Sequence, residues 1–210
     1  MQNLLRFCFI CAFALALASC GNKADGLDSN DPVKLIVVQP YGNFPKKMVN
    51  IAVDGIKSKY RFDIKVLDAV PLPTSAYYQP RNRYIADSLL NDLKRRKPKE
   101  AFRIIGLTEK DISTRKDDIK NYGVMGLGLL GGYSCVVSSF RIQRSASVKV
   151  LHQRFVKIVN HEVGHTLGLD HCNTLNCVMQ AVNGQIQRVD NESGALCETC
   201  SDKVFHFLLK

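Results

Sequence analysis

A single run of eleven residues constrains the fold of this 210-residue chain more than any other feature. Residues 161–171 read HEVGHTLGLDH. Positions four apart on an α-helix share one face, about 6 Å apart along the axis, so His161 and His165 can present two imidazoles to one metal ion. Gly168 stands where the chain must leave the helix, often through a left-handed conformation that glycine adopts most easily. That turn would bring His171 back as a third ligand.

The three histidines predict a catalytic rather than a structural zinc ion, because three nitrogen ligands leave one tetrahedral position open for water. Zinc lowers the pKa of that water towards 7. Glu162 points about 100° around the helix from His161, so it can stand beside the metal without binding it. It is expected to act as the general base and to pass the proton to the leaving amine. The predicted reaction is hydrolysis of a peptide bond by a zinc-bound water molecule.

A second cluster of possible ligands begins at the residue after the third histidine. Cys172 and Cys177 form one closely spaced pair, and Cys197 and Cys200 form a C-x-x-C pair. Two such pairs joined by a longer loop are the usual layout of a structural zinc ion held by four thiolates. The alternative is two disulfides, which an exported location would favour. The spacing alone leaves both open.

Met179 stands eight residues after His171. Core packing would explain an isolated methionine. After H-E-x-x-H-x-x-G-x-x-H, however, the same residue fits the Met-turn of the metzincin metallopeptidases, in which a methionine lies beneath the metal. We therefore interpret Met179 as the methionine of such a turn.

The run from His161 to Cys200 closely resembles the archaemetzincin family, because its glycine, cysteines and methionine stand at that family's intervals. Weaker similarity extends upstream through YYQPRNRY, RIIGLTEKDI and CVVSSFRI, and covers most of residues 33–205. The resemblance implies an α/β (α+β), metzincin-like fold. Such a fold has a twisted mixed β-sheet packed with helices, including a long active-site helix. A small irregular C-terminal subdomain, stabilised by zinc, would begin at about residue 169.

The resemblance also implies two zinc ions per chain, one catalytic and one structural. The catalytic ion would be bound by His161, His165 and His171, with Glu162 as the base. The structural ion would be held by Cys172, Cys177, Cys197 and Cys200. The cysteine cluster would have no open position for water, so we do not expect it to be catalytic.

Upstream of the motif, strands and helices are predicted to alternate, which is typical of an α/β fold. Apolar and alternating runs predict strands at 33–40, 62–68, 101–108 and 134–142. Helical spacing predicts helices at 45–60, 84–96 and 147–167. The glycine-rich stretch 122–133 lacks the ending of a phosphate-binding loop, so we interpret it as a strand and a loop over a cleft.

Several residues outside the motif are candidates for the cleft. The strand at 134–142 is either the edge against which an extended peptide pairs or an interior strand. Tyr122 and Tyr133 could bind substrate or a developing oxyanion, although their spacing does not demand it. Cys135 is expected to be a buried, small apolar residue.

The N-terminal segment predicts export. Arg6 precedes the apolar stretch FCFICAFALALA, which is too short to span a membrane and is typical of a signal-peptide core. The stretch ends in LASC, which resembles the lipobox of bacterial lipoproteins; the alternative is an ordinary signal peptide with a chance cysteine. We predict a lipoprotein signal peptide at 1–19, lipidation at Cys20, a flexible tether at 20–32 and a metallopeptidase domain at 33–210.

The formal net charge is +10, but the lysines and arginines are dispersed, so we predict no nucleic-acid partner. The predicted partners are a peptide or protein substrate and the membrane that carries the lipid anchor. We expect a monomer at the bacterial cell envelope, on the periplasmic or outer-membrane face. The function predicted is a zinc metallopeptidase acting on short peptides or as an aminopeptidase. The alternative is a non-catalytic or weakly active surface lipoprotein that binds zinc or peptide. Glu162 favours the enzyme, because capture needs only the ligands.

Overall fold

The computed structural model describes residues 33–209 of the chain. The predicted signal peptide at 1–19, the lipid site Cys20 and the tether at 20–32 lie outside the described residues. Among residues 33–209, no helix combines the length and the apolar character needed to cross a membrane.

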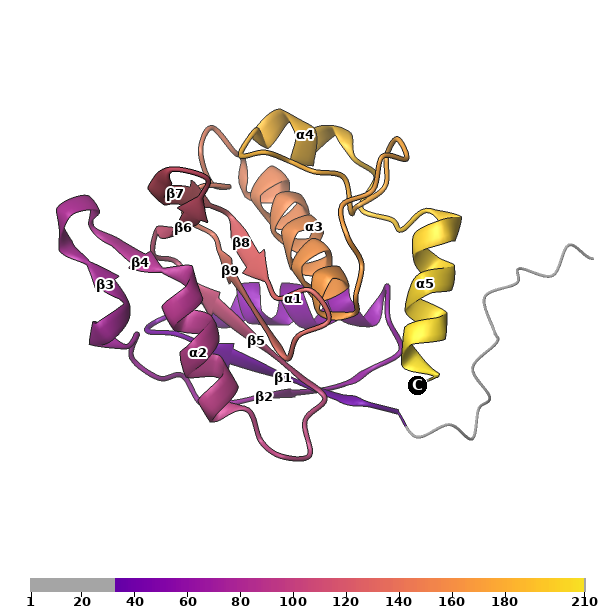
Figure 1. Cartoon of the computed structure of the whole chain (residues 1–210), viewed down its shortest axis with the longest axis horizontal. Coiled ribbons are helices and arrows are strands. Elements are labelled where there is room, and N and C mark those ends of the chain that lie inside the picture. Colours follow the sequence, from indigo (N-terminus) through magenta and orange to yellow (C-terminus); the bar gives the residue numbers. More distant parts are fainter. Residues whose placement is uncertain (1–32, 210) are drawn as a thin grey trace, which may run out of the picture.

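A five-stranded mixed sheet forms the centre of the molecule (Figure 1). In spatial order its strands are β2 (Asp63–Val66), β1 (Leu35–Pro40), β5 (Arg103–Thr108), β9 (Ser134–Ser138) and β8 (Gly126–Gly128). The first four strands are parallel, and β8 runs antiparallel to β9. The central strands β1, β5 and β9 are almost entirely buried, as expected for parallel strands covered on both faces.

Helices cover the two faces of this sheet unequally. The helices α1 (Lys46–Lys57) and α3 (Val148–Thr166) lie on one face, and α2 (Ala86–Arg96) lies on the other (Figure 1). Successive residues of a strand point to opposite faces. Accordingly, β1 directs Ile36 and Val38 into the core under α1 and α3, and Val37 into the core under α2.

The long helix α3 matches the helix predicted at 147–167. Ser147 caps its N-terminus, because the serine hydroxyl accepts a hydrogen bond from the backbone N–H of Val150. The predicted apolar residues Phe155, Ile158 and Val159 are buried against the sheet. Packing against the sheet therefore fixes the position of the C-terminal half of this helix, which carries the first two histidines.

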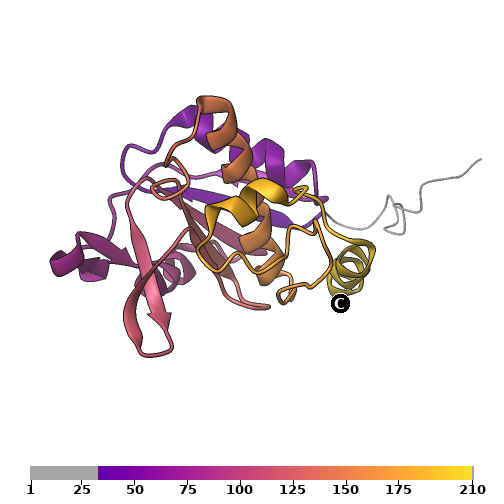
Figure 2. The same ribbon diagram turned by 90° about the horizontal axis from the view of Figure 1, so that it is seen from above.

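A second, four-stranded sheet lies beside the first. Its strands, in spatial order, are β3 (Tyr77–Tyr78), β4 (Arg83–Ile85), β6 (Ile112–Lys116) and β7 (Ile119–Val124), and two short 3-10 helices, Thr74–Ala76 and Gln79–Arg81, flank β3. Figure 2 shows the hairpin of β6 and β7 projecting from the body of the molecule. Arg83 and Arg141 both bind the carboxylate of Asp111 at 2.7 Å, which fixes the base of this sheet. After Met125, β7 continues into β8, so one segment joins both sheets.

The C-terminal segment contains two helices, α4 (Ile186–Asn191) and α5 (Glu198–Leu208). Two basic residues of α3 hold α4. Arg154 binds both carboxylate oxygens of Asp190 at 2.7 Å, and the ammonium of Lys157 donates to the carbonyl of Val189 at 2.8 Å. These contacts fix the chain that leads from Met179 into α4 against the helix that carries the histidines.

The structure confirms the predicted order of strands and helices up to α3, with one correction. The strand predicted at 134–142 ends at Ser138 and lies between β5 and β8, so the edge-strand hypothesis for it is wrong. The edge strand beside it is β8, within the glycine-rich stretch, and the other edge of the sheet is β2. The second sheet and the helices α4 and α5 were not predicted from the sequence.

Candidate metal centres

The three histidines of the motif converge on one point. The ligand nitrogens of His161, His165 and His171 all lie within 4.8 Å of one another. The Nε2 atoms of His161 and His165 are 3.1 Å apart. In a tetrahedral zinc site with bonds of about 2.0–2.1 Å, two nitrogen ligands lie roughly 3.3 Å apart. The cluster therefore fits a zinc ion without rearrangement of the helix.

Backbone carbonyls orient the first two imidazoles. Nδ1 of His161 lies 2.7 Å from the carbonyl oxygen of Val178, and Nδ1 of His165 lies 2.7 Å from that of Leu169. A proton on Nδ1 satisfies each carbonyl and leaves Nε2 as the electron-pair donor. Burial lowers the pKa of both rings, to about 3 for His161. The rings are therefore neutral, which is the form that binds a metal ion.

Gly168 makes the turn that the sequence predicts. Its φ of +82° lies in the left-handed region. In this conformation the N–H of Leu169 reaches back to the carbonyl of Gly164 at 3.1 Å, and closes the end of α3. The chain then reverses, and His171 comes alongside the two helical histidines.

The buried carboxyl group of Glu162 faces the edge strand β8. A Cβ atom placed at Gly126 would lie 2.5 Å from Oε1 of Glu162, and one at Gly128 would lie 3.2 Å from Oε2. Only glycines allow β8 to approach so closely. Burial raises the pKa of Glu162 to about 8, and hydrogen bonding with the backbone of Gly128 opposes this shift. A divalent cation beside the carboxyl group would lower that pKa again.

The glycines of β8 are functional residues that the sequence analysis missed. The glycine-rich stretch was predicted to be a strand and a loop over a cleft, but that prediction does not explain why the strand contains glycines. Residues two apart in a strand face the same side, so glycines at both 126 and 128 indicate a strand that another group approaches closely on one face.

Met179, the methionine of the predicted Met-turn, packs against α3 next to the second histidine. Its side chain is fully buried, and its sulfur packs against Gly164, the residue before His165 on α3. Its carbonyl oxygen accepts the backbone N–H of Cys172 at 2.8 Å. The same short segment therefore contacts His161, through the carbonyl of Val178, and adjoins the cysteine cluster.

The four cysteines of the C-terminal segment form a separate cluster. The sulfurs of Cys172, Cys177, Cys197 and Cys200 lie within 4.8 Å of one another, and none of these thiols is in a disulfide. The Sγ atoms of Cys172 and Cys197 are 3.7 Å apart. Two thiolates on a tetrahedral zinc ion lie about 3.8 Å apart, whereas a disulfide holds its sulfurs at about 2.05 Å. The arrangement therefore fits zinc.

One thiol of this cluster is readily ionised. Burial opposes ionisation of Cys197, but hydrogen bonds with Cys200, Thr174 and Cys172 together outweigh it and lower the pKa of Cys197 to about 6. A thiolate is the form in which cysteine binds zinc. Cys135, the fifth cysteine in residues 33–209, is buried in the core and takes no part in the cluster.

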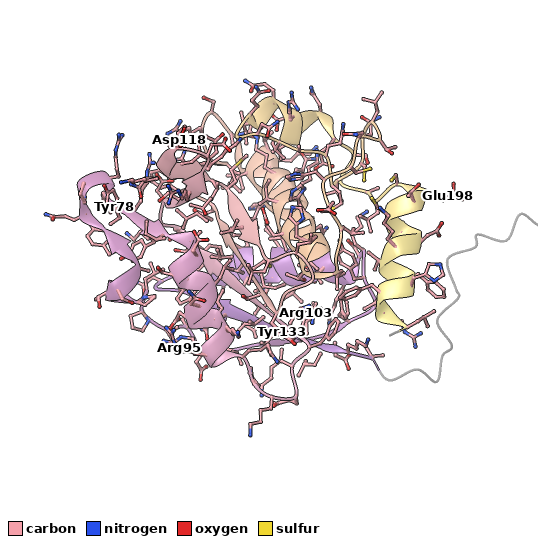
Figure 3. The ribbon with its side chains drawn as sticks, in the orientation of Figure 1. Tyr78, Arg95, Arg103, Asp118, Tyr133 and Glu198 are labelled. Carbon is pink, nitrogen blue, oxygen red and sulfur yellow. The ribbon has the colours of Figure 1, made fainter. Side chains whose placement is uncertain are left out.

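The two candidate tyrosines lie far apart. The hydroxyl of Tyr122, on β7, donates to the carbonyl of Asn183 at 3.2 Å, beyond Met179 along the chain. The ring of Tyr133 lies instead beside Arg103, with its centre 5.6 Å from the guanidinium carbon, in the lower half of the molecule in Figure 3. Asp118, at the tip of the β6–β7 hairpin, stands at the opposite side of that view. Tyr133 is therefore not close to β7.

The fold and the site together define the class of protein. Three clustered histidines beside a buried glutamate and a buried methionine, on this fold, are the features of a zinc metallopeptidase of the metzincin type. The family model of peptidase family M54 matches residues 34–206. The chain belongs to peptidase family M54, the family that the resemblance to archaemetzincins predicts.

Its relatives and structural neighbours agree. Archaemetzincin from Haloarcula marismortui is 34% identical over 175 residues, which cover 80% of this chain and 97% of the relative. The crystal structure of archaemetzincin from Methanopyrus kandleri matches with a TM-score of 0.74 and 28% identity, over 88% of this chain and 100% of that one. Archaemetzincin from Archaeoglobus fulgidus, crystallised with malonate, matches with a TM-score of 0.69 and 30% identity, over 80% and 99%.

Proposed function

We propose that the protein hydrolyses peptide bonds with Glu162 as the general base, and that His161, His165 and His171 hold the catalytic zinc ion. The observation that carries this proposal is the convergence of the three ligand nitrogens within 4.8 Å, next to a glutamate that is buried but not a ligand. A site that served only to hold zinc would not need a buried carboxyl group beside it, since burial of a carboxylate is costly.

The bound zinc ion would act as a Lewis acid and make a water molecule acidic enough to react near neutral pH. The chain supplies the other requirements. The carboxylate of Glu162 accepts a proton from the water and delivers it to the nitrogen of the leaving amine. Close packing by Gly126 and hydrogen bonding with Gly128 hold the carboxylate in one orientation. The carbonyls of Val178 and Leu169 keep two imidazoles in place.

We further propose that the cysteine cluster holds a second, structural zinc ion. Four thiolates fill a tetrahedral site and leave no position for water. This ion would tie α5 to the segment that contains Met179, because Cys177 precedes the methionine and Cys200 lies in the first turn of α5. Its proposed role is therefore to fix the segment of Val178 and Met179, which packs against α3 beside the histidines.

The edge strand β8 is the proposed binding site for the substrate backbone. Within residues 33–209 it pairs with β9 on one side, so the other side can pair with an extended peptide. Main-chain pairing gives affinity that does not depend on sequence. We propose that the enzyme acts on short peptides or as an aminopeptidase.

The proposed location is the bacterial cell envelope, where Cys20 would carry a lipid anchor on a monomeric enzyme. The hydrophobic stretch that ends in LASC supports this proposal. Growth with a labelled fatty acid should label the wild-type chain and leave Cys20→Ser unlabelled. Equal labelling of both chains would refute the anchor.

The proposed function is tested with a broad peptide library and the zinc-loaded protein. We expect cleavage products in mass spectra, their loss after zinc is removed with a chelator, and their return after zinc is added back. A protein that holds zinc in the histidine site and cleaves no member of the library would instead support the second candidate, a lipoprotein that captures zinc or peptides.

The contact between β8 and Glu162 gives a prediction about Gly126→Ala. The added methyl group would meet Glu162 at 2.5 Å and displace its carboxylate. A misplacement of about 1 Å in a catalytic group can cost on the order of 10²-fold in rate, and we expect a loss of that size in kcat/KM. Zinc content should stay unchanged. The control is Val66→Ala, at an exposed position of β2 at the other edge of the sheet, which should keep wild-type activity. Equal activity of Gly126→Ala and wild type would contradict the proposed orientation of Glu162.

A further inference from the structure

Two chain segments border the face of α3 that carries the histidines. On one side β8 packs against Glu162 through Gly126 and Gly128. On the other side the carbonyl of Val178 contacts His161. We call residues 119–128 the upper rim and residues 178–185 the lower rim. A peptide that pairs with β8 has to lie between them.

The two rims meet at Tyr122. This residue precedes Gly126 by four positions on the upper rim, and Asn183 follows Met179 by four positions on the lower rim. The hydroxyl of Tyr122 donates to the carbonyl of Asn183 at 3.2 Å. It also lies against Gly184, where a Cβ atom would be 2.7 Å from it. In Figures 1 and 2 the segment that leads into α4 reaches towards β7 in both views.

The lower side of this contact is a tight turn. Asn183 and Gly184 both have positive φ, 49° and 74°, and the N–H of Gln185 donates to the carbonyl of Val182 at 2.9 Å. Two central residues with positive φ and this hydrogen bond define a type I′ turn. Arg188 also donates to the carbonyl of Ala181 at 3.1 Å, which ties the turn to α4.

The upper side is held as well. Tyr122 pairs with Thr114 in the β6–β7 hairpin, and the ammonium of Lys116 lies 4.8 Å from the centre of its ring. α4, in turn, is fastened to α3 through Asp190 and Arg154. Both partners of the contact are therefore positioned by elements that do not depend on the contact itself.

We propose that Tyr122 closes one end of the substrate groove and determines how many substrate residues fit on that side of the cleaved bond. This inference rests on the proposed function, because it assumes that a peptide lies along β8. A strand rises about 3.3 Å per residue, so Tyr122 lies at most roughly 13 Å from Gly126, which leaves room for at most about four residues of an extended peptide. The enzyme would thus cut close to one end of its substrates and tolerate any length on the other side.

The test measures peptide binding, so that it does not depend on turnover. The probes are fluorescent peptides with about six randomised residues, used alone or extended by about eight Gly/Ser residues at the amino or the carboxyl end, well beyond the four that fit. Binding to zinc-loaded Glu162→Gln protein is followed by anisotropy. We expect one extension to weaken binding at least about tenfold and the other to change it less than about threefold.

Variants of Tyr122 identify the cause of that asymmetry. Tyr122→Ala in the same background should bind both extended pools equally, whereas Tyr122→Phe should retain the asymmetry because the ring still fills the gap. Tyr133→Ala is the matched control, an exposed tyrosine beside Arg103, and should behave as the parent does.

The inference is overturned if both extensions bind alike in the parent protein, if Tyr122→Ala keeps the asymmetry, or if no pool binds. Failure of the proposed function is a separate result. It would appear as zinc-loaded wild-type protein that binds these pools with the expected asymmetry and cleaves none of them.

Discussion

Replacing Glu162 by glutamine is expected to lower kcat/KM by about 10²–10⁴-fold, the usual contribution of a general base. Glutamine has the same shape and can still accept a hydrogen bond from the backbone of Gly128, so the variant loses the proton acceptor and little else. Zinc content should be the same in both proteins, because Glu162 is not among the clustered ligand atoms. The measurements are steady-state kinetics on a peptide from the library and zinc analysis.

Glu192→Gln is the matched control for this prediction. Glu192 is also a buried glutamate, and burial raises its pKa, but it accepts a hydrogen bond from the backbone of Gly194 rather than facing the histidines. Its replacement should leave kcat/KM close to the wild-type value. If Glu162→Gln retained more than about a tenth of wild-type activity, Glu162 would not be the base.

Replacing Cys172 by serine is expected to release the structural zinc ion and to lower thermal stability strongly. An ion present at about a thousand times its dissociation constant stabilises the folded state by about 4 kcal/mol. For a chain of this size, each 1 kcal/mol corresponds to about 2–4 °C in Tm, so we expect a fall of about 8–16 °C. Activity should fall as well, because Cys172 follows His171 directly and its N–H binds the carbonyl of Met179. Calorimetry and zinc analysis check this prediction.

The fifth cysteine supplies the control. Cys135→Ala also removes a buried thiol, but Cys135 lies in β9, outside the cluster. It should cost on the order of 1 kcal/mol, as small truncations in a core do, with zinc content unchanged. A Cys172→Ser chain with normal zinc content, stability and turnover would show that the cysteine cluster does not hold an ion that matters to the fold.

The clustering of the three histidines can be predicted from the sequence because its determinants are local. The spacing of His161 and His165 follows from helix geometry, and the turn that returns His171 follows from the left-handed conformation of Gly168, which the structure confirms at φ +82°. The helix itself was predicted from the helical spacing of its apolar residues, which the structure shows to be buried. Each of these inferences concerns residues within about twenty positions of one another.

Other features depend on contacts between distant parts of the chain, and the sequence does not reveal them. The glycines of β8 make room for a glutamate that lies more than thirty residues away. Tyr122 meets Asn183 across 61 positions. The second sheet was missed because its strands are short and partly exposed, so they lack a continuous apolar run. The strand at 134–142 was predicted from its alternating pattern, which does not say whether a strand lies at an edge or in the interior of a sheet.

The adjacent residues His171 and Cys172 are central to this account, because they are proposed to bind different ions. Crystals of the zinc-loaded protein, measured at the zinc absorption edge, test this directly. We predict two anomalous peaks, one at about 2.0–2.1 Å from nitrogens of His161, His165 and His171, and one at about 2.3 Å from the four sulfurs. A single peak shared by His171 and Cys172, or disulfides in place of the second peak, would contradict the account.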